Sequence, residues 1–240
     1  MKKSLVLLSL GLLAVAQITN AADVTGTISL KGAAPAEIDI GPTMTESSPD
    51  CAALYAGRKL PTTHFYVVGK AGELADVVVS LKDAAGNAIT GKSTGSSAPA
   101  VELDQKGCVY TPEILAVQTG QKIIVKNSDP CVHNVHTSPV DNPESNQVQM
   151  PGGADLTFTF AKPEPFLKFK CDVHPWMFAW VSVFDSPYFA VSGKDGKFTI
   201  KNVPPGEYTL VAAHRKLGTQ TAKIEVKAGG AVQNFTFDVK

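Results

Sequence analysis

Short runs of apolar residues, many alternating with polar ones, dominate this chain. The stretches 157–160 (TFTF) and 167–170 (LKFK) alternate strictly, as half-buried β-strands do. The pattern predicts a first series of strands at 24–30, 75–81, 121–126, 156–160, 166–170 and 178–184. It predicts a second series at 190–192, 198–200, 207–212, 222–226 and 235–239. No later stretch keeps a helical period, so the predicted fold class is all-β, and a sandwich would bury these strands.

The segments between the strands are short or rich in turn-forming residues. One short helix is expected over 50–58, with Asp50 as its N-cap. Glycine, serine, asparagine and proline mark 85–100 and 141–153 as surface loops.

The N-terminus has the pattern of an export signal. Two lysines precede an apolar run over 4–16, which is too short to span a bilayer comfortably. Small residues follow, so residues 1–22 are interpreted as a signal peptide cleaved after Ala21 or Ala22; an uncleaved anchor is the alternative. No later segment is apolar enough to span a membrane. We therefore expect a periplasmic or otherwise extracytoplasmic protein with no membrane span in its mature chain.

The overall charge bears on the kind of partner. The chain has 22 basic and 22 acidic residues among 240. A nucleic-acid-binding surface needs a clustered excess of basic residues, so this balance argues against a nucleic-acid partner.

The segment after the strand at 166–170 has the composition of a metal site. Cys171, His174 and Met177 offer a thiolate, an imidazole and a thioether within seven residues. Thiolate and thioether favour Cu(I), and imidazole suits both copper oxidation states. Zinc rarely uses methionine, the C-x-x-C-H of a c-type haem is absent, and an iron–sulfur cluster would need more cysteines.

A second imidazole is available upstream, after the strand at 121–126. His133 is the candidate ligand. Its neighbour Asn134 is expected to hold this segment against the cysteine loop by hydrogen bonding.

Together these two segments resemble the blue (type 1) copper cupredoxins, with amicyanins and plastocyanins nearest. The similarity lies in H-N-V-H at 133–136 and C-x-x-H-P-W-M at 171–177. The resemblance implies one copper ion that cycles between Cu(I) and Cu(II), held by His133, Cys171, His174 and Met177. Met177 would be the weak axial contact, and His136 a non-ligand.

The same resemblance implies a fold and an electron exit. The expected fold is a cupredoxin-like Greek-key β-sandwich over 23–185, with an insertion around 45–110. In this family the second loop histidine reaches the surface within an apolar docking patch. His174 would then be the exit for electrons, with Pro175 and Trp176 beside it.

The C-terminal segment 186–240 resembles the carboxypeptidase regulatory-like (transthyretin-like) β-sandwich module. The similarity lies in D-G-x-F-x-I followed by V-P-P-G-x-Y-x-L. The Asp-Gly turn at 194–197 predicts a hairpin. The module would be complete only by borrowing strands from the N-terminal part, since 24–28 and 75–81 resemble its opening strands.

The other three cysteines would lie in an oxidising compartment, where disulfides are permitted. We expect a Cys51–Cys108 disulfide and a free Cys131. A Cys108–Cys131 bridge is the main alternative, and a direct role of Cys131 at the metal is another.

The predicted function is a one-electron carrier between an unidentified donor and acceptor protein, without enzymatic activity. The alternatives are a copper storage or delivery protein and a copper-dependent oxidoreductase. The chain has five histidines. After the two ligands, three scattered histidines remain, too few for a trinuclear copper cluster.

Overall fold

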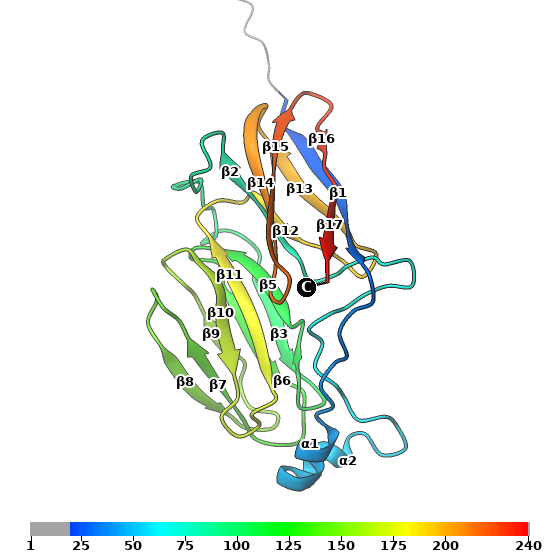
Figure 1. Cartoon of the computed structure of the whole chain (residues 1–240). Helices are drawn as coiled ribbons and strands as arrows, with labels where there is room; N and C mark the ends of the chain where they lie inside the picture. The colour runs from blue at the N-terminus through cyan, green and yellow to red at the C-terminus, as the bar shows by residue number, and fades with distance from the viewer. Residues whose placement is uncertain (1–19, 240) are drawn as a thin grey trace, which may run out of the picture.

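Two β-sandwiches, joined end to end, make up the computed structural model, which describes residues 20–239 (Figure 1). The first sandwich packs a sheet of order β5-β11-β10-β7-β8 against a sheet of order β4-β3-β6-β9. Its strands are β3 (Val101–Gln105), β4 (Tyr110–Thr111), β5 (Ile114–Gln118), β6 (Ile123–Asn127), β7 (His133–Ser138), β8 (Ser145–Gln149), β9 (Leu156–Phe158), β10 (Glu164–Lys170) and β11 (Phe178–Phe184). The all-β prediction is confirmed.

Strand alternation builds the core of the first sandwich. In β10, Leu167 and Phe169 are buried, while Lys168 between them is partly exposed. The Phe169 ring meets Phe158 and Phe160 edge-on, with centroids 5.4 and 5.9 Å away. Such pairs stabilise a core beyond the area they bury.

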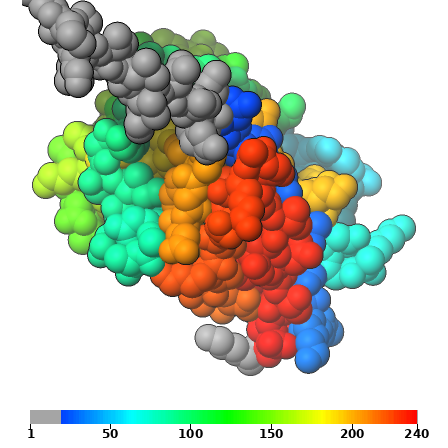
Figure 2. Space-filling model, turned by 90° about the horizontal axis from the view of Figure 1, so that it is seen from above, coloured from blue at the N-terminus to red at the C-terminus, as the bar shows by residue number. Residues whose placement is uncertain are grey.

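The second sandwich draws on both ends of the chain. One sheet has the order β13-β1-β16, with β17 also paired to β1; the other has the order β12-β2-β14-β15. Its strands are β1 (Ala22–Lys31), β2 (Val78–Asp83), β12 (Phe189–Val191), β13 (Lys197–Val203), β14 (Gly206–His214), β15 (Gly218–Val226), β16 (Ala231–Val232) and β17 (Phe235–Asp238). Figure 2 shows the blue N-terminal strand beside the orange and red C-terminal ones.

The predicted domain boundaries, 23–185 and 186–240, are therefore wrong for the first two strands. Ile28 of β1 lies opposite Phe235, and Leu81 of β2 lies opposite Leu210. The module is completed by borrowed N-terminal strands, the alternative that the sequence pattern left open. The physical reason is burial, because β1 and β2 supply much of the module's apolar core.

The predicted Asp-Gly hairpin is also wrong. A tight turn does occur at 194–197, with Gly196 at φ +70°. However, β12 before the turn pairs with β2, and β13 after it pairs with β1. The turn therefore crosses from one sheet to the other.

Two short helices replace the single helix expected over 50–58: α1 (Gly41–Ser47) and α2 (Pro49–Ala53). Each has a proline in its first turn, where the missing N–H costs nothing. Asp50 lies inside α2, and Ser48 occupies the N-cap position, so the predicted cap is wrong. The expected loop at 141–153 contains β8, which is polar and lies at a sheet edge.

Of the signal peptide expected over 1–22, residues 1–19 lie outside the described residues. Between residues 20 and 239, no helix has the length and apolar character needed to cross a bilayer.

Stability of the second sandwich should depend on pH through His214. Its ring is buried, and its Nδ1 accepts the backbone N–H groups of Lys216 and Leu217 at 3.2 Å each. Burial lowers the pKa of His214 to about 4, whereas an unfolded chain keeps a value of about 6.5. The unfolded state therefore binds more protons between these pH values, and stability falls as the pH drops from 6.5 to 4.

We expect this effect to reach about 2–3 kcal/mol at pH 4, following from about 1.4 kcal/mol for each unit of pKa shift. Denaturant unfolding at pH 7 and pH 4.5 measures it. His214→Asn retains an acceptor without a titrating ring and should flatten the dependence. Equal pH slopes for both proteins would contradict the assignment.

Candidate metal site

Strand pairing brings the two predicted metal-binding segments together at one end of the first sandwich. β10 runs antiparallel to β7, with Lys170 opposite His136. Cys171 directly follows β10, and His133 begins β7, so both residues lie at the same end of this sheet. The loop 171–177 then leads into β11 and carries His174.

Three of the predicted ligands converge. Nδ1 of His133 and Nδ1 of His174 lie 2.9 Å apart. The Cys171 Sγ lies 4.0 Å from the first nitrogen and 3.7 Å from the second. The exposed fractions of His133, Cys171 and His174 are 0%, 2% and 3%, so the cluster is almost completely removed from solvent.

The spacing of these atoms fits a transition metal. Around one ion, nitrogen donors at about 2.0–2.1 Å and sulfur at about 2.3 Å lie roughly 3–4 Å from one another. The three separations in this cluster match that range. A thiolate with two imidazoles is the donor set of blue-copper sites and suits copper in both oxidation states.

Met177 closes the same loop. Its backbone N–H donates to the His174 carbonyl at 2.9 Å, and its carbonyl accepts the Cys171 N–H at 3.2 Å. The Met177 side chain is 1% exposed and belongs to the core of the first sandwich. Its role as the axial ligand stays a prediction.

Asn134 links the two segments, as the role predicted for it requires. Its Oδ1 accepts the Asp172 N–H at 2.7 Å and lies 3.3 Å from the Cys171 Sγ. Its Nδ2 donates to Asn146 at 2.7 Å and to Asp172 at 3.0 Å. One buried amide therefore positions the cysteine relative to β7.

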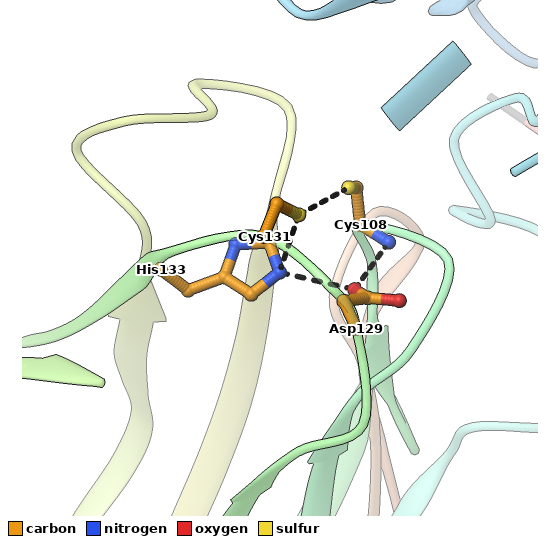
Figure 3. A group of neighbouring side chains, drawn as sticks. All are labelled: Cys108, Asp129, Cys131 and His133. Atoms are coloured by element: carbon orange, nitrogen blue, oxygen red, sulfur yellow. Dashed lines mark hydrogen bonds and ion pairs between the residues drawn. The ribbon is translucent and has the colours of Figure 1, made fainter. Parts of the chain in front are cut away.

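Asp129, which the sequence reasoning did not single out, orients His133. Its Oδ2 lies 3.0 Å from the His133 Nε2 and accepts the Cys108 N–H at 2.7 Å (Figure 3). Its Oδ1 accepts the Gly107 N–H. A carboxylate at Nε2 favours the tautomer with its proton there, which leaves Nδ1 free to bind metal. The sequence feature that could have indicated this role is the position of Asp129 four residues before His133.

Hydrogen bonds within the cluster shift the pKa values of Cys171 and His133. Burial alone raises the pKa of Cys171, but hydrogen bonds from His133, His174 and the backbone bring it down to about 6. Burial alone lowers the pKa of His133, but hydrogen bonds to Asp129 and Cys171 and their charges raise it overall. The cysteine is thus disposed to be the thiolate that metal binding requires.

His136 lies apart from this cluster. Residues 133 and 136 point to opposite faces of β7, because strand residues alternate. The His136 Nδ1 lies 2.6 Å from Asp172, and its Nε2 lies 2.6 Å from Glu144. It stabilises the outer surface of the ligand loop.

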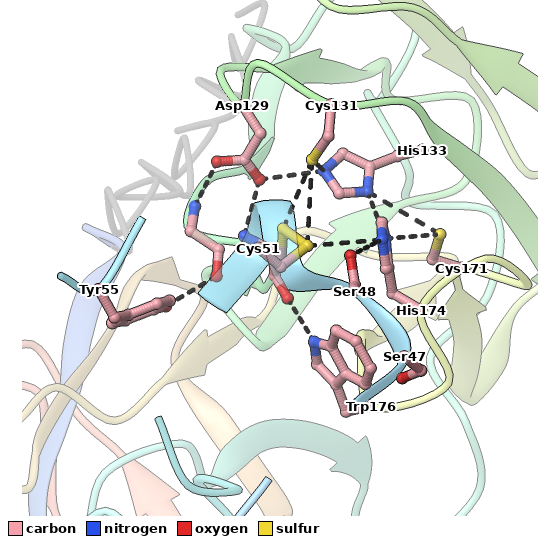
Figure 4. Close-up of a disulfide and its surroundings, with 12 residues drawn as sticks. Ser47, Ser48, Cys51, Tyr55, Asp129, Cys131, His133, Cys171, His174 and Trp176 are labelled. Atoms are coloured by element: carbon pink, nitrogen blue, oxygen red, sulfur yellow. Dashed lines mark hydrogen bonds and ion pairs between the residues drawn. A yellow bond between two sulfur atoms is a disulfide. The ribbon is translucent and has the colours of Figure 1, made fainter. Parts of the chain in front are cut away.

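Residues 41–53, containing α1 and α2, cover the outer edge of His174 (Figure 4). The Ser48 Oγ and the Cys51 Sγ lie 3.1 and 3.4 Å from the His174 Nε2. A disulfide joins Cys51 to Cys108, which is the expected pairing. We call residues 41–53 the cap.

The cap makes the expected electron exit wrong. His174 does not reach the surface, and Trp176 is 8% exposed, with its indole N–H donating to the Cys108 carbonyl at 2.9 Å. Pro175 is exposed, as expected. Nothing in the local sequence pattern of residues 41–53 indicates which part of the sandwich the cap covers.

Cys131 is free and half-buried. Its Sγ lies 3.6 Å from the His133 Nε2 and 3.5 Å from the Cys108 Sγ. Burial, followed by the charges of Asp129 and Asp50, raises the pKa of the Cys131 thiol to about 11. It borders the imidazole on the side away from Cys171.

Comparison with family models matches only the C-terminal part of the chain. The carboxypeptidase regulatory-like domain model matches residues 174–240. The match begins inside the first sandwich and leaves out β1 and β2, which complete the second. No curated protein matches the chain.

Solved structures similar to the chain include several cupredoxins. A purple cupredoxin from Nitrosopumilus maritimus is 20% identical, with a TM-score of 0.30, over 35% of this chain and 98% of that one. A Cu(I) amicyanin variant is 19% identical, with a TM-score of 0.32, over 45% and 98%. The copper-containing nitrite reductase of Thermus scotoductus SA-01 is 20% identical, with a TM-score of 0.32, over 42% and 26%.

Removing the Asn134 side chain should weaken the site specifically. Asn134→Ala leaves the Asp172 N–H without its acceptor, so we expect a loss of about 1–3 kcal/mol in unfolding free energy and a 10–100-fold loss in copper affinity. Asn142→Ala is a matched control, because this buried asparagine also bonds across loops, to Lys162 and Glu164. This control variant should lower the free energy of unfolding without lowering copper affinity. Equal copper affinity in Asn134→Ala and the native protein would contradict this role.

Proposed function

We propose that this protein is an exported type 1 copper protein that carries single electrons between extracytoplasmic redox partners. The observation that carries the proposal is the convergence of three buried donors, His133 Nδ1, His174 Nδ1 and Cys171 Sγ, at 2.9 to 4.0 Å. Copper bound to such a set exchanges one electron between its Cu(I) and Cu(II) states.

The surroundings of the donors favour a site that changes little between oxidation states. Asp129 holds His133 from behind, Asn134 holds the backbone after Cys171, and Ser48 lies against His174. Each ligand is thus positioned by a neighbour before any metal arrives. A carrier benefits because little rearrangement accompanies each electron transfer.

Burial favours a carrier over the two alternatives. A delivery protein must let a partner's ligand reach the metal, and an enzyme must keep an open position for substrate. Here the cap covers His174, and His133 is 0% exposed. Among residues 20–239, the donors are covered on the sides where a partner ligand or a substrate would approach, so we propose no enzymatic activity.

Since His174 is covered, electrons need another exit. Within the ligand loop, Val173 is 56% exposed and Pro175 is also exposed. The Val173 N–H donates to the side-chain oxygen of Asn134. On the neighbouring strand β8, Val148 lies opposite Asn134 and is 65% exposed. We propose that Val148, Val173 and Pro175 form the docking patch for redox partners.

Colour tests the copper assignment. Native protein loaded with Cu(II) should absorb strongly in the visible range through thiolate-to-copper charge transfer, and Cys171→Ser should abolish this band. Cys131→Ser, which removes the other free thiol, should retain it. A colourless native Cu(II) form, or an absorption band that depends on Cys131 instead, would contradict the proposal.

Electron self-exchange between copies of the protein tests the docking patch without a known partner. Val173→Lys places a charge on each of two surfaces that must meet, so we expect the exchange rate to fall about tenfold through like-charge repulsion. NMR line broadening in mixtures of the Cu(I) and Cu(II) forms measures the rate. Val232→Lys adds the same charge to the second sandwich, where Val232 is 76% exposed, and should leave the rate unchanged. Equal rates in both variants would argue against this patch.

A further inference from the structure

Three sulfur atoms lie together behind the proposed copper ligands. The Cys131 Sγ lies 3.5 Å from the Cys108 Sγ and 4.0 Å from the Cys51 Sγ, and the latter two form the disulfide (Figures 3 and 4). Cys51 comes from the cap, Cys108 from the β3–β4 turn and Cys131 from the β6–β7 connection. Electron transfer at Cys171 requires none of them.

Thiol–disulfide exchange is one use for such a cluster, but the geometry does not favour it. A thiolate attacks a disulfide along the line of the S–S bond, so its distances to the two sulfurs should differ by about 2 Å, the length of that bond. For Cys131 the two distances are 3.5 and 4.0 Å. This sulfur therefore lies beside the bond and not on its extension.

A position beside both sulfurs instead suits a site in which three sulfur ligands surround one metal ion. Three thiolates that bind one ion at about 2.3 Å lie about 4 Å from one another. Cys131 already has this spacing to Cys51 and Cys108. Breaking the disulfide would allow its two sulfurs to separate toward the same distance.

We propose that reduction of the Cys51–Cys108 disulfide creates a second metal site, in which Cys51, Cys108 and Cys131 bind one Cu(I) ion. Thiolate ligands select Cu(I) over harder divalent ions. This site is independent of the proposed electron-transfer function, because it shares no ligand with the first.

The redox step balances with a dithiol as reductant. The dithiol gives two electrons and two protons, becomes a disulfide itself, and leaves Cys51 and Cys108 as thiols. Cu(I) then replaces the thiol protons, which pass to solvent.

Two imidazoles lie between the two sites. His133 turns Nδ1 toward Cys171 and Nε2 toward Cys131, at 3.6 Å. His174 turns Nδ1 toward Cys171 and Nε2 toward Cys51, at 3.4 Å. The second site thus borders the first through the ring nitrogens that face away from Cys171, and reduction also releases the covalent tie between cap and sandwich.

Cu(I) binding to full-length protein that carries Cys171→Ser tests the proposal with the thiolate of the first site removed. The protein is reduced with a phosphine, freed of it without oxygen and titrated with Cu(I) against a colorimetric Cu(I) chelator. We expect no tight binding before reduction, one Cu(I) per chain after it, and at least tenfold weaker binding when Cys131→Ser is added. No Cu(I) bound after reduction, or equal binding without Cys131, would overturn it.

A second measurement covers the case in which reduction loosens the fold. Since Cu(I) binds only the reduced form, it should make the disulfide easier to reduce, by about 30 mV for each tenfold rise in free Cu(I) above its dissociation constant. Near-UV circular dichroism follows the fold throughout. A reduction potential independent of Cu(I), or a reduced chain that loses its near-UV signal and does not regain it with Cu(I), also overturns the proposal.

Discussion

One buried carboxylate, Asp129, connects the parts of this protein that matter for its chemistry. It accepts the backbone N–H groups of Gly107 and Cys108 and lies against the His133 Nε2. A buried carboxylate is costly to desolvate unless such partners satisfy it. The same contacts orient the imidazole toward Cys171 and position Cys108 for its disulfide. Asp129 therefore supports both the metal-facing geometry and the residue that ties the cap to the sandwich.

The cap distinguishes this sandwich from the arrangement that its motifs alone imply. Met44 anchors α1 in the core of the first sandwich, and Cys51 ties α2 to the β3–β4 turn. Between them, Ser48 lies against His174. The histidine edge that the cupredoxin resemblance places at the surface is thus buried, which moves the electron exit toward the exposed residues of the ligand loop. It also places sulfur chemistry within contact distance of both imidazoles.

The sequence predicted what short spacing and ligand chemistry determine. Cys171 and His174 follow from one segment, and strand alternation accounts for most of the strands. The choice of His133 over His136 needed a family resemblance, because both lie in the same short strand, β7. The cap, the Asp129 contacts and the pairing of β1 with the C-terminal strands depend on long-range packing. No local pattern encodes which distant surface will cover a given face, so these features became visible only in three dimensions.

X-ray absorption at the copper edge tests the central claim most directly, because it identifies the atoms bound to the metal. For native protein with its disulfide intact and one Cu(II) bound, the account predicts a nearest shell of one sulfur and two imidazole nitrogens, with the sulfur lost in Cys171→Ser. A shell of nitrogen and oxygen alone, or a sulfur that persists in Cys171→Ser, would contradict the assignment of His133, Cys171 and His174 as the copper ligands.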